Sequence, residues 1–226
     1  MKTIESVMNH ELKLASNWLK LNKLSLNKDK TKLVIFHSKR KKLDKNALSI
    51  KIDRHKIPIV DKVKYLGMYL DQHLSWESHI NQLSIKLSQA NGILSKLRHF
   101  VPQNTLVQVY YAIFYSHLLY GCAIWGQAIE KLMETIRVLQ RKCVRTITFS
   151  DFRCHSPPLF SSLKLLKVDD IVKLNVLNFV YDFSHNLLPD DLKYFYSICS
   201  DIHDHNIRQV NDLLFITRIN SKYYGE

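Results

Sequence analysis

The residues best suited to chemistry on a charged partner are lysines that crowd a short segment between two apolar elements. The segment 20–36 reads KLNKLSLNKDKTKLVIF. Residues 20–64 carry fifteen Lys and Arg against four Asp and no Glu, a net +11 of the chain's +13. Such a concentrated field suits a polyphosphate partner, because each neutralised phosphate releases counterions. The composition favours nucleic acid, and solubility or a localisation signal at residues 39–42 is the alternative.

Two pairs of adjacent carboxylates and one Cys/His group are candidate metal ligands by residue type. Asp169–Asp170 and Asp190–Asp191 stand where helical patterns begin, and carboxylates are stabilised there by free N–H groups and the helix dipole. Cys199, His203 and His205 lack a fourth ligand at a useful spacing. We therefore expect no metal site in this chain.

The elements that position the lysines follow from hydrophobic periodicity. Apolar residues at steps of three and four predict a helix over residues 3–21. We then expect a short strand at 33–36, a hairpin with arms 48–52 and 57–60 turning at 53–55, and a strand over 63–70. After Ser75 the period lengthens and predicts helices near 80–97, 105–125, 129–147 and 169–183.

Composition agrees with an α+β fold in which helices dominate. The chain has 226 residues, of which 46% are hydrophobic, and only five glycines and five prolines. Four scattered cysteines without a CxxC pair, and no signal peptide, predict an intracellular protein of the nucleus or cytoplasm that is not secreted. Residues 101–129 lack charges but are interrupted by polar residues, so we expect a buried helix and no membrane contact.

Several motifs, in order, resemble a known family. They are NWLKLNKLSLNKDKTKLVIF, VKYLGMYLDQHLSWESHI, VYYAIFYSHLLYGCAIWG, LPDDL and HDHNIR…YYG. Their order and spacing are similar to reverse transcriptases of non-LTR (LINE-like) retrotransposons after the catalytic loop, over essentially all 226 residues. The resemblance implies a remnant of the polymerase palm with its primer-grip hairpin at 1–74, a helical thumb at 75–150 and a C-terminal helical region at 151–226.

The resemblance also implies roles for individual residues. Lys30 and Thr31 match a turn that faces the incoming triphosphate, where an ammonium group stabilises developing negative charge. Tyr65 and Gly67 match the primer grip, where glycine in a strand would admit the primer backbone. Further contacts to the RNA template and DNA primer, or to an RNA–DNA duplex, are expected from the thumb and the lysine turn, at Lys28, Lys32, Lys96 and Arg98. His79 and the polar face of the helix that follows it are expected to belong to the thumb.

The family's Mg²⁺ ligands are aspartates that precede the first helix of this chain, and no counterpart of them occurs here. We therefore expect a C-terminal polymerase fragment that is inactive alone and lacks an N-terminal half, which leaves Trp18 and Phe36 partly exposed. The alternative is a stand-alone basic nucleic-acid-binding protein derived from such an element. A third possibility is a helical interaction protein whose charge is incidental.

Overall fold

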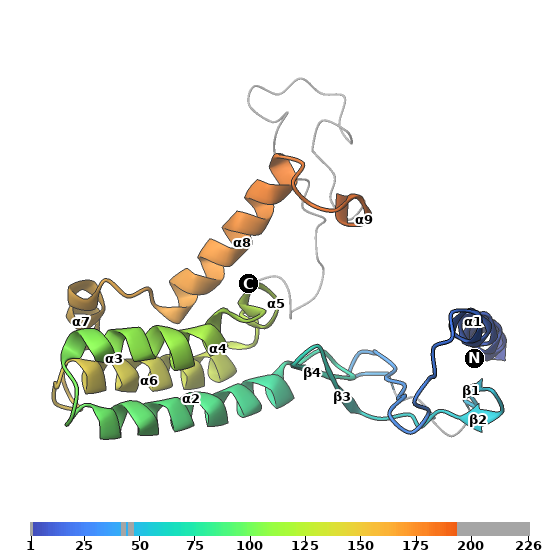
Figure 1. Ribbon diagram of the computed structural model, residues 1–226, viewed down its shortest axis with the longest axis horizontal. Coiled ribbons are helices and arrows are strands. Elements are labelled where there is room, and N and C mark those ends of the chain that lie inside the picture. Colours follow the sequence, from blue (N-terminus) through green and yellow to red (C-terminus); the bar gives the residue numbers. More distant parts are fainter. Residues whose placement is uncertain (1, 42–43, 45–47, 194–226) are drawn as a thin grey trace. The chain divides into compact units, whose positions relative to one another are not determined.

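Helices account for most of the computed structural model, which describes residues 2–41, 44 and 48–193 (Figure 1). The helices and strands run in the order α1 (Lys2–Leu21), β1 (Lys51–Ile52), β2 (His55–Lys56), β3 (Lys62–Tyr65), β4 (Met68–Asp71), α2 (Glu77–Leu97), α3 (Gln103–Val109), η2 (Tyr110–Tyr115), α4 (Ser116–Leu119), α5 (Cys122–Trp125), α6 (Glu130–Ile147), α7 (Ser156–Leu163), α8 (Val168–Ser184) and α9 (Asp190–Lys193). The α+β class is confirmed. Two compact units divide the chain, 1–173 and 174–226, and their boundary falls inside α8.

Helix α1 packs on a small antiparallel hairpin formed by β1 and β2. The hairpin core is Ile50, Ile52 and Ile57, and it is covered by Met8, Leu12, Leu26 and Leu33. The Asn9 side chain holds the two elements together: its amide donates to the Ser49 carbonyl at 3.1 Å and its oxygen accepts from the Lys51 N–H at 2.8 Å. The predicted helix over 3–21 is confirmed. A hairpin is present as predicted, but its strands are shorter and its second strand is 55–56 and not 57–60, because the chain turns within two residues, at Asp53 and Arg54.

The prediction of a single strand over 63–70 is wrong, because this segment forms a second hairpin. β3 and β4 pair antiparallel, with Tyr65 opposite Met68, and the turn is Leu66–Gly67. Both turn residues have positive φ, 45° and 82°, the backbone of the tight turns that match the twist of paired strands. Apolar residues on both sides of Gly67 hid the turn in the sequence.

The predicted strand at 33–36 is also wrong. Only Leu33 forms a bridge, to Ile59, with its N–H donating to the Pro58 carbonyl at 3.0 Å and its carbonyl accepting from Val60 at 2.9 Å. The next long-range backbone bond joins the His37 N–H to the Gln72 carbonyl at 2.9 Å, so the segment passes from one hairpin to the other. Among the described residues, no single strand runs alongside 33–36 for long enough to form a ladder of hydrogen bonds with it.

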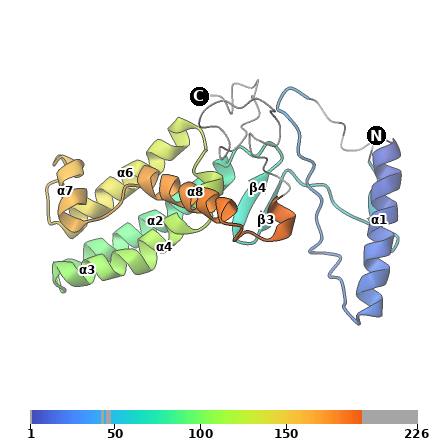
Figure 2. The ribbon, with the colours of Figure 1, turned by 90° about the horizontal axis from the view of Figure 1, so that it is seen from above.

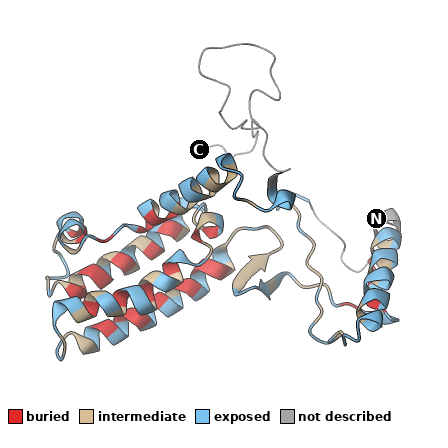
Figure 3. Cartoon of the chain, turned by 45° about the horizontal axis from the view of Figure 1, so that its top comes forward, coloured by how far each residue is buried: buried red, intermediate tan, exposed pale blue. Residues whose placement is uncertain are grey.

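The helices after Ser75 form a bundle in which α2 is central. α2, the rod built from α3, η2 and α4, and α6 lie side by side in Figure 1 and in Figure 2, and their buried residues face one another in Figure 3. The face of α2 that is buried consists of Ile80, Leu83, Leu87, Ala90 and Leu94, as its heptad seam predicts. Asn91 on the same face donates to the Leu139 carbonyl of α6 at 3.0 Å.

The helix predicted over 105–125 is interrupted twice. Residues 110–115 form one π-helical turn, in which Tyr110 and Phe114 are both fully buried and stack at 5.4 Å between ring centroids. The rod then ends at Tyr120, whose backbone is extended, and Gly121 has a φ of 63° before α5 begins. Glycine permits that left-handed backbone without a steric penalty, so the chain turns here.

Gln140 is a buried polar centre that connects three elements of the bundle. Its side-chain amide donates to the Tyr110 hydroxyl at 3.0 Å and to the Leu166 carbonyl at 2.9 Å, and its oxygen accepts from the Val168 N–H at 2.8 Å. Burial raises the pKa of Tyr110, and the hydrogen bond from Gln140 partly offsets that rise. The network fixes the start of α8 against α6 and η2.

The carboxylate pairs lie at helix starts, as predicted. Asp169 and Asp170 occupy the first turn of α8. The Asp169 carboxylate accepts from Arg137, whose Nε–H is shared between both oxygens at 3.0 Å and whose Nη2 donates at 2.9 Å. Asp190 and Asp191 occupy the first turn of α9. Within the described part of the chain, no helix combines the length and the apolar character needed to cross a membrane.

Candidate nucleic-acid interface

The lysine-rich segment after α1 is folded into a tight turn by Asn27. The side-chain oxygen of Asn27 accepts from the Lys30 N–H at 3.0 Å, and the backbone carbonyl of Asn27 accepts from the Thr31 hydroxyl at 2.9 Å. Lys30 and Lys32 are exposed, and no carboxylate among the described residues pairs with either. The turn therefore presents two unneutralised ammonium groups, while the Thr31 hydroxyl is engaged by the backbone.

Lys28 differs from its neighbours because it faces a carboxylate. Asp53, in the turn of the β1–β2 hairpin, accepts from the Lys20 ammonium at 2.9 Å and from the buried Ser16 hydroxyl at 2.8 Å, and the Lys28 Nζ lies 3.9 Å from its second oxygen. The hydrogen bonds from Lys20 and Ser16 lower the pKa of Asp53. These groups line a hollow of about 410 Å³ beside the lysine turn. The charge of Lys28 is therefore partly neutralised before any ligand binds.

The β3–β4 hairpin presents its turn to solvent on one side only. Tyr65 is 60% exposed and Leu66 is 70% exposed. On the other side the Tyr120 hydroxyl donates to the Leu66 carbonyl, and a Cβ placed on Gly67 would lie 3.3 Å from the Tyr120 ring. Gly67 lies in the turn and not in a strand interior, and the chemical group that approaches it closely is Tyr120. Nothing in the sequence around Tyr120 singles that residue out.

His79, which the resemblance assigns to the thumb, is buried. Only 6% of it is exposed, and its ring packs 6.0 Å from the Trp125 ring. Its Nδ1 accepts from the Tyr69 N–H at 3.5 Å, whereas its Nε2 is buried without a hydrogen-bond partner in the described structure. Burial lowers the pKa of His79. The residue lies in the first turn of α2, next to the buried seam position Ile80, and the hairpin covers it there.

Lys96 and Arg98 lie at the opposite end of α2 from the hairpin. A helix of 21 residues is about 30 Å long, so these cations and the hairpin turn are separate parts of the surface. Lys96 is exposed in the last turn of α2. The Arg98 guanidinium lies over the Phe149 ring at 4.9 Å. The predicted site residues thus fall into three groups: the lysine turn, the hairpin turn and the far end of α2.

No described group of three His, Cys, Asp or Glu side chains comes together as a metal site. The residues described therefore do not fit the Mg²⁺ ions that polymerase chemistry requires. Cys199, His203 and His205 lie outside the described residues, as does the HDHNIR…YYG motif.

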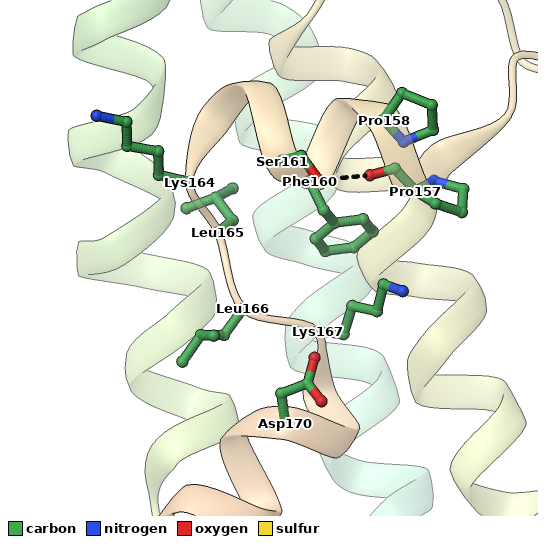
Figure 4. A pocket seen from close by; sticks show the side chains of 9 residues that line it. All are labelled: Pro157, Pro158, Phe160, Ser161, Lys164, Leu165, Leu166, Lys167 and Asp170. Atoms are coloured by element: carbon green, nitrogen blue, oxygen red, sulfur yellow. Dashed lines mark hydrogen bonds between the residues drawn. The ribbon is translucent and has the colours of Figure 1, made fainter.

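A hollow of about 690 Å³ lies between α7 and the start of α8. Figure 4 shows that Phe160, Leu165 and Leu166 line it and that the amines of Lys164 and Lys167 extend to opposite sides. The Ser161 hydroxyl in its lining donates to the Pro157 carbonyl at 3.4 Å. Because that hydroxyl is bonded to the backbone and not to a base, the hollow has no arrangement for nucleophilic catalysis.

Comparison with known proteins identifies relatives of one kind. The chain is 28% identical over 159 residues to a probable RNA-directed DNA polymerase from the transposon X-element of Drosophila melanogaster; the match covers 69% of this chain and 17% of that protein. It is 27% identical over 183 residues to the RNA-directed DNA polymerase of the mobile element jockey of the same species, over 79% of this chain and 19% of the relative. The jockey polymerase of Drosophila funebris is 28% identical over 114 residues, which are 49% of this chain and 12% of the relative.

These relatives confirm the resemblance to reverse transcriptases of non-LTR retrotransposons that the motifs indicate. The matched region amounts to less than a fifth of each relative's length. No family model matches the chain, and no solved structure is similar to it.

Proposed function

We propose that this chain is the part of a non-LTR retrotransposon reverse transcriptase that holds the template–primer duplex. The observation that carries the proposal is the exposed lysine turn, which lies within a segment of net charge +11 in a chain whose relatives are RNA-directed DNA polymerases. Lys30 and Lys32 would contact phosphates, either those of the duplex backbone or those of an incoming nucleotide. Such contacts position a nucleic acid without reading its sequence.

The hairpin turn would act as the primer grip. Tyr65 and Leu66 are exposed toward a ligand, and the Tyr120 hydroxyl fixes the turn from behind through the Leu66 carbonyl. In this proposal Gly67 serves the turn geometry and the contact with Tyr120, and Tyr65 contacts the primer. The proposed contribution of this chain is contact with the duplex, and we assign no polymerisation step to its residues.

The test is the binding of a fluorescein-labelled RNA–DNA duplex to the full chain, measured by fluorescence anisotropy at 50 and 200 mM salt. The double variant Lys30→Ala/Lys32→Ala is expected to bind more weakly. Its slope of log affinity against log salt is expected to be shallower by about one for each lysine that neutralises a phosphate in the parent complex. Lys131→Ala, which removes an exposed lysine of α6, is the matched control and is expected to bind as the parent does. Equal salt slopes for parent and double variant would remove the lysine turn from the interface.

A further inference from the structure

The end of the bundle where α2 and α6 terminate exposes three phenylalanines. Phe100 is 84% exposed, Phe152 is 73% exposed and Phe149 is 49% exposed. The two helices run in the same direction, since Asn91 bonds to Leu139 and Arg98 lies over Phe149, so their C-terminal ends meet at this place. We call Phe100, Phe149 and Phe152 with the arginines beside them the aromatic end.

Guanidinium groups lie over two of the three rings of the aromatic end. The Arg98 guanidinium lies 4.9 Å from the Phe149 ring centroid, and the Arg153 guanidinium lies 5.1 Å from that of Phe152. The segments 93–104 and 142–153 carry five Lys and Arg against one carboxylate, Asp151. Rings flanked by guanidinium groups in a positive field match the chemistry of a ligand that has both flat bases and phosphates.

The backbone at Phe149 shows that the ring is presented in a strained conformation. Phe149 follows α6 with a φ of 57°, and it closes the helix in a Schellman motif: Ser150 donates to the Arg145 carbonyl at 3.1 Å and Phe149 donates to the Thr146 carbonyl at 3.4 Å. Glycine is the usual residue at this left-handed position, and a bulky side chain there is strained. About half of the Phe149 side chain is exposed in this conformation, so its ring is open to a ligand.

We propose that the aromatic end binds single-stranded nucleic acid by stacking bases on Phe100, Phe149 and Phe152 while the arginines contact phosphates. This surface is separate from the lysine turn and the hairpin turn, and it does not depend on duplex binding. A single strand fits better than a duplex, because the bases of a duplex are stacked on each other and their faces are closed to a protein ring.

The experiment measures binding of the full chain to three fluorescein-labelled 12-mers: oligo(dT), oligo(U) and an abasic deoxyribose-phosphate strand. For Phe100→Ala/Phe152→Ala, affinity for the base-bearing strands is expected to fall about fivefold or more per ring, and affinity for the abasic strand and for an RNA–DNA duplex is expected to stay unchanged. Phe36→Leu, which removes an exposed ring elsewhere, is the matched control. The comparison of oligo(dT) with oligo(U) shows whether DNA or RNA is the preferred strand.

Phe149→Gly separates binding from folding. Its urea midpoint is expected not to fall, since glycine relieves the left-handed strain, whereas its affinity for the single strands is expected to drop. Two results would overturn the proposal: variants that bind the base-bearing strands as the parent does, or an abasic strand that binds the parent as tightly as oligo(dT). The second result would mean that the surface attracts polyanions in general.

Discussion

Replacing Gln140 by Met should destabilise the helical bundle by about 3 kcal/mol. Methionine is similar in volume and unbranched, so it leaves no large cavity, but it cannot make the three hydrogen bonds of the amide. The Tyr110 hydroxyl and the Val168 N–H are buried, and the free energy of unfolding falls by about 1–2 kcal/mol for each of them that is left without its partner. The Leu166 carbonyl contributes less, because Leu166 is 44% exposed and water can replace the amide there.

The assay is urea unfolding of the full chain followed by circular dichroism at 222 nm. Gln108→Met is the control, since Gln108 lies exposed on α3, and its stability should change by no more than about 0.5 kcal/mol. Tyr110→Phe alone should cost about 1 kcal/mol, but in the Gln140→Met background it should cost less or even stabilise, because it removes a hydroxyl that no longer has its donor. A decrease below about 1 kcal/mol for Gln140→Met, or additive effects for the pair, would refute the description of Gln140 as the polar centre of the bundle.

Two further predictions concern stability. Gly92→Ala should stabilise the chain by about 0.5–1 kcal/mol, because Gly92 lies within α2 and nothing lies within 4 Å of the added Cβ. Gly126→Ala should destabilise it by about 1–3 kcal/mol, because the added Cβ would lie 2.4 Å from a Val172 methyl carbon. The urea midpoints of the two variants measure both effects. The lowered pKa of His79 keeps the ring neutral in the folded state, so stability is full above the ordinary value of 6.5 and is lost as the pH falls through the folded pKa. Urea midpoints at pH 7.5 and pH 5 should differ less for His79→Gln than for the parent, and an equal difference would show that another group governs the acid range.

The sequence predicts those elements whose apolar residues follow one period without interruption. The α2 seam and the face of α6 follow from such a period, and the resemblance predicts the exposure of Trp18 and Phe36, which are 60% and 52% exposed. The predicted strand and helix boundaries fail where a glycine allows a turn, or where a π-helical turn adds one residue to the helix. Gly67 makes a hairpin of the predicted strand, and the π-turn at 110–115 keeps apolar residues on one face through an irregular helix.

The sequence predicts which residue types make up the candidate site better than it predicts which of these residues contact one another. The resemblance singles out Lys30 and Lys32, and both are exposed. It does not predict the pairing of Lys28 with Asp53, because Asp53 lies far along the chain and reaches Lys28 only through the hairpin turn. The sequence also does not reveal the burial of His79, which depends on the hairpin that lies over it. Contacts of this kind arise from tertiary packing, which periodicity along one element does not report.

The β3–β4 hairpin is fastened to the bundle at three points. The Tyr120 hydroxyl donates to the Leu66 carbonyl, and the His79 Nδ1 accepts from the Tyr69 N–H. The Met68 sulfur packs against Gly121 so closely that a Cβ added there would lie only 2.7 Å from it. These contacts engage both the turn and β4, so they join the hairpin to the helices along its length. In the proposed function, any displacement of the helices would therefore also displace Tyr65, the residue proposed to contact the primer.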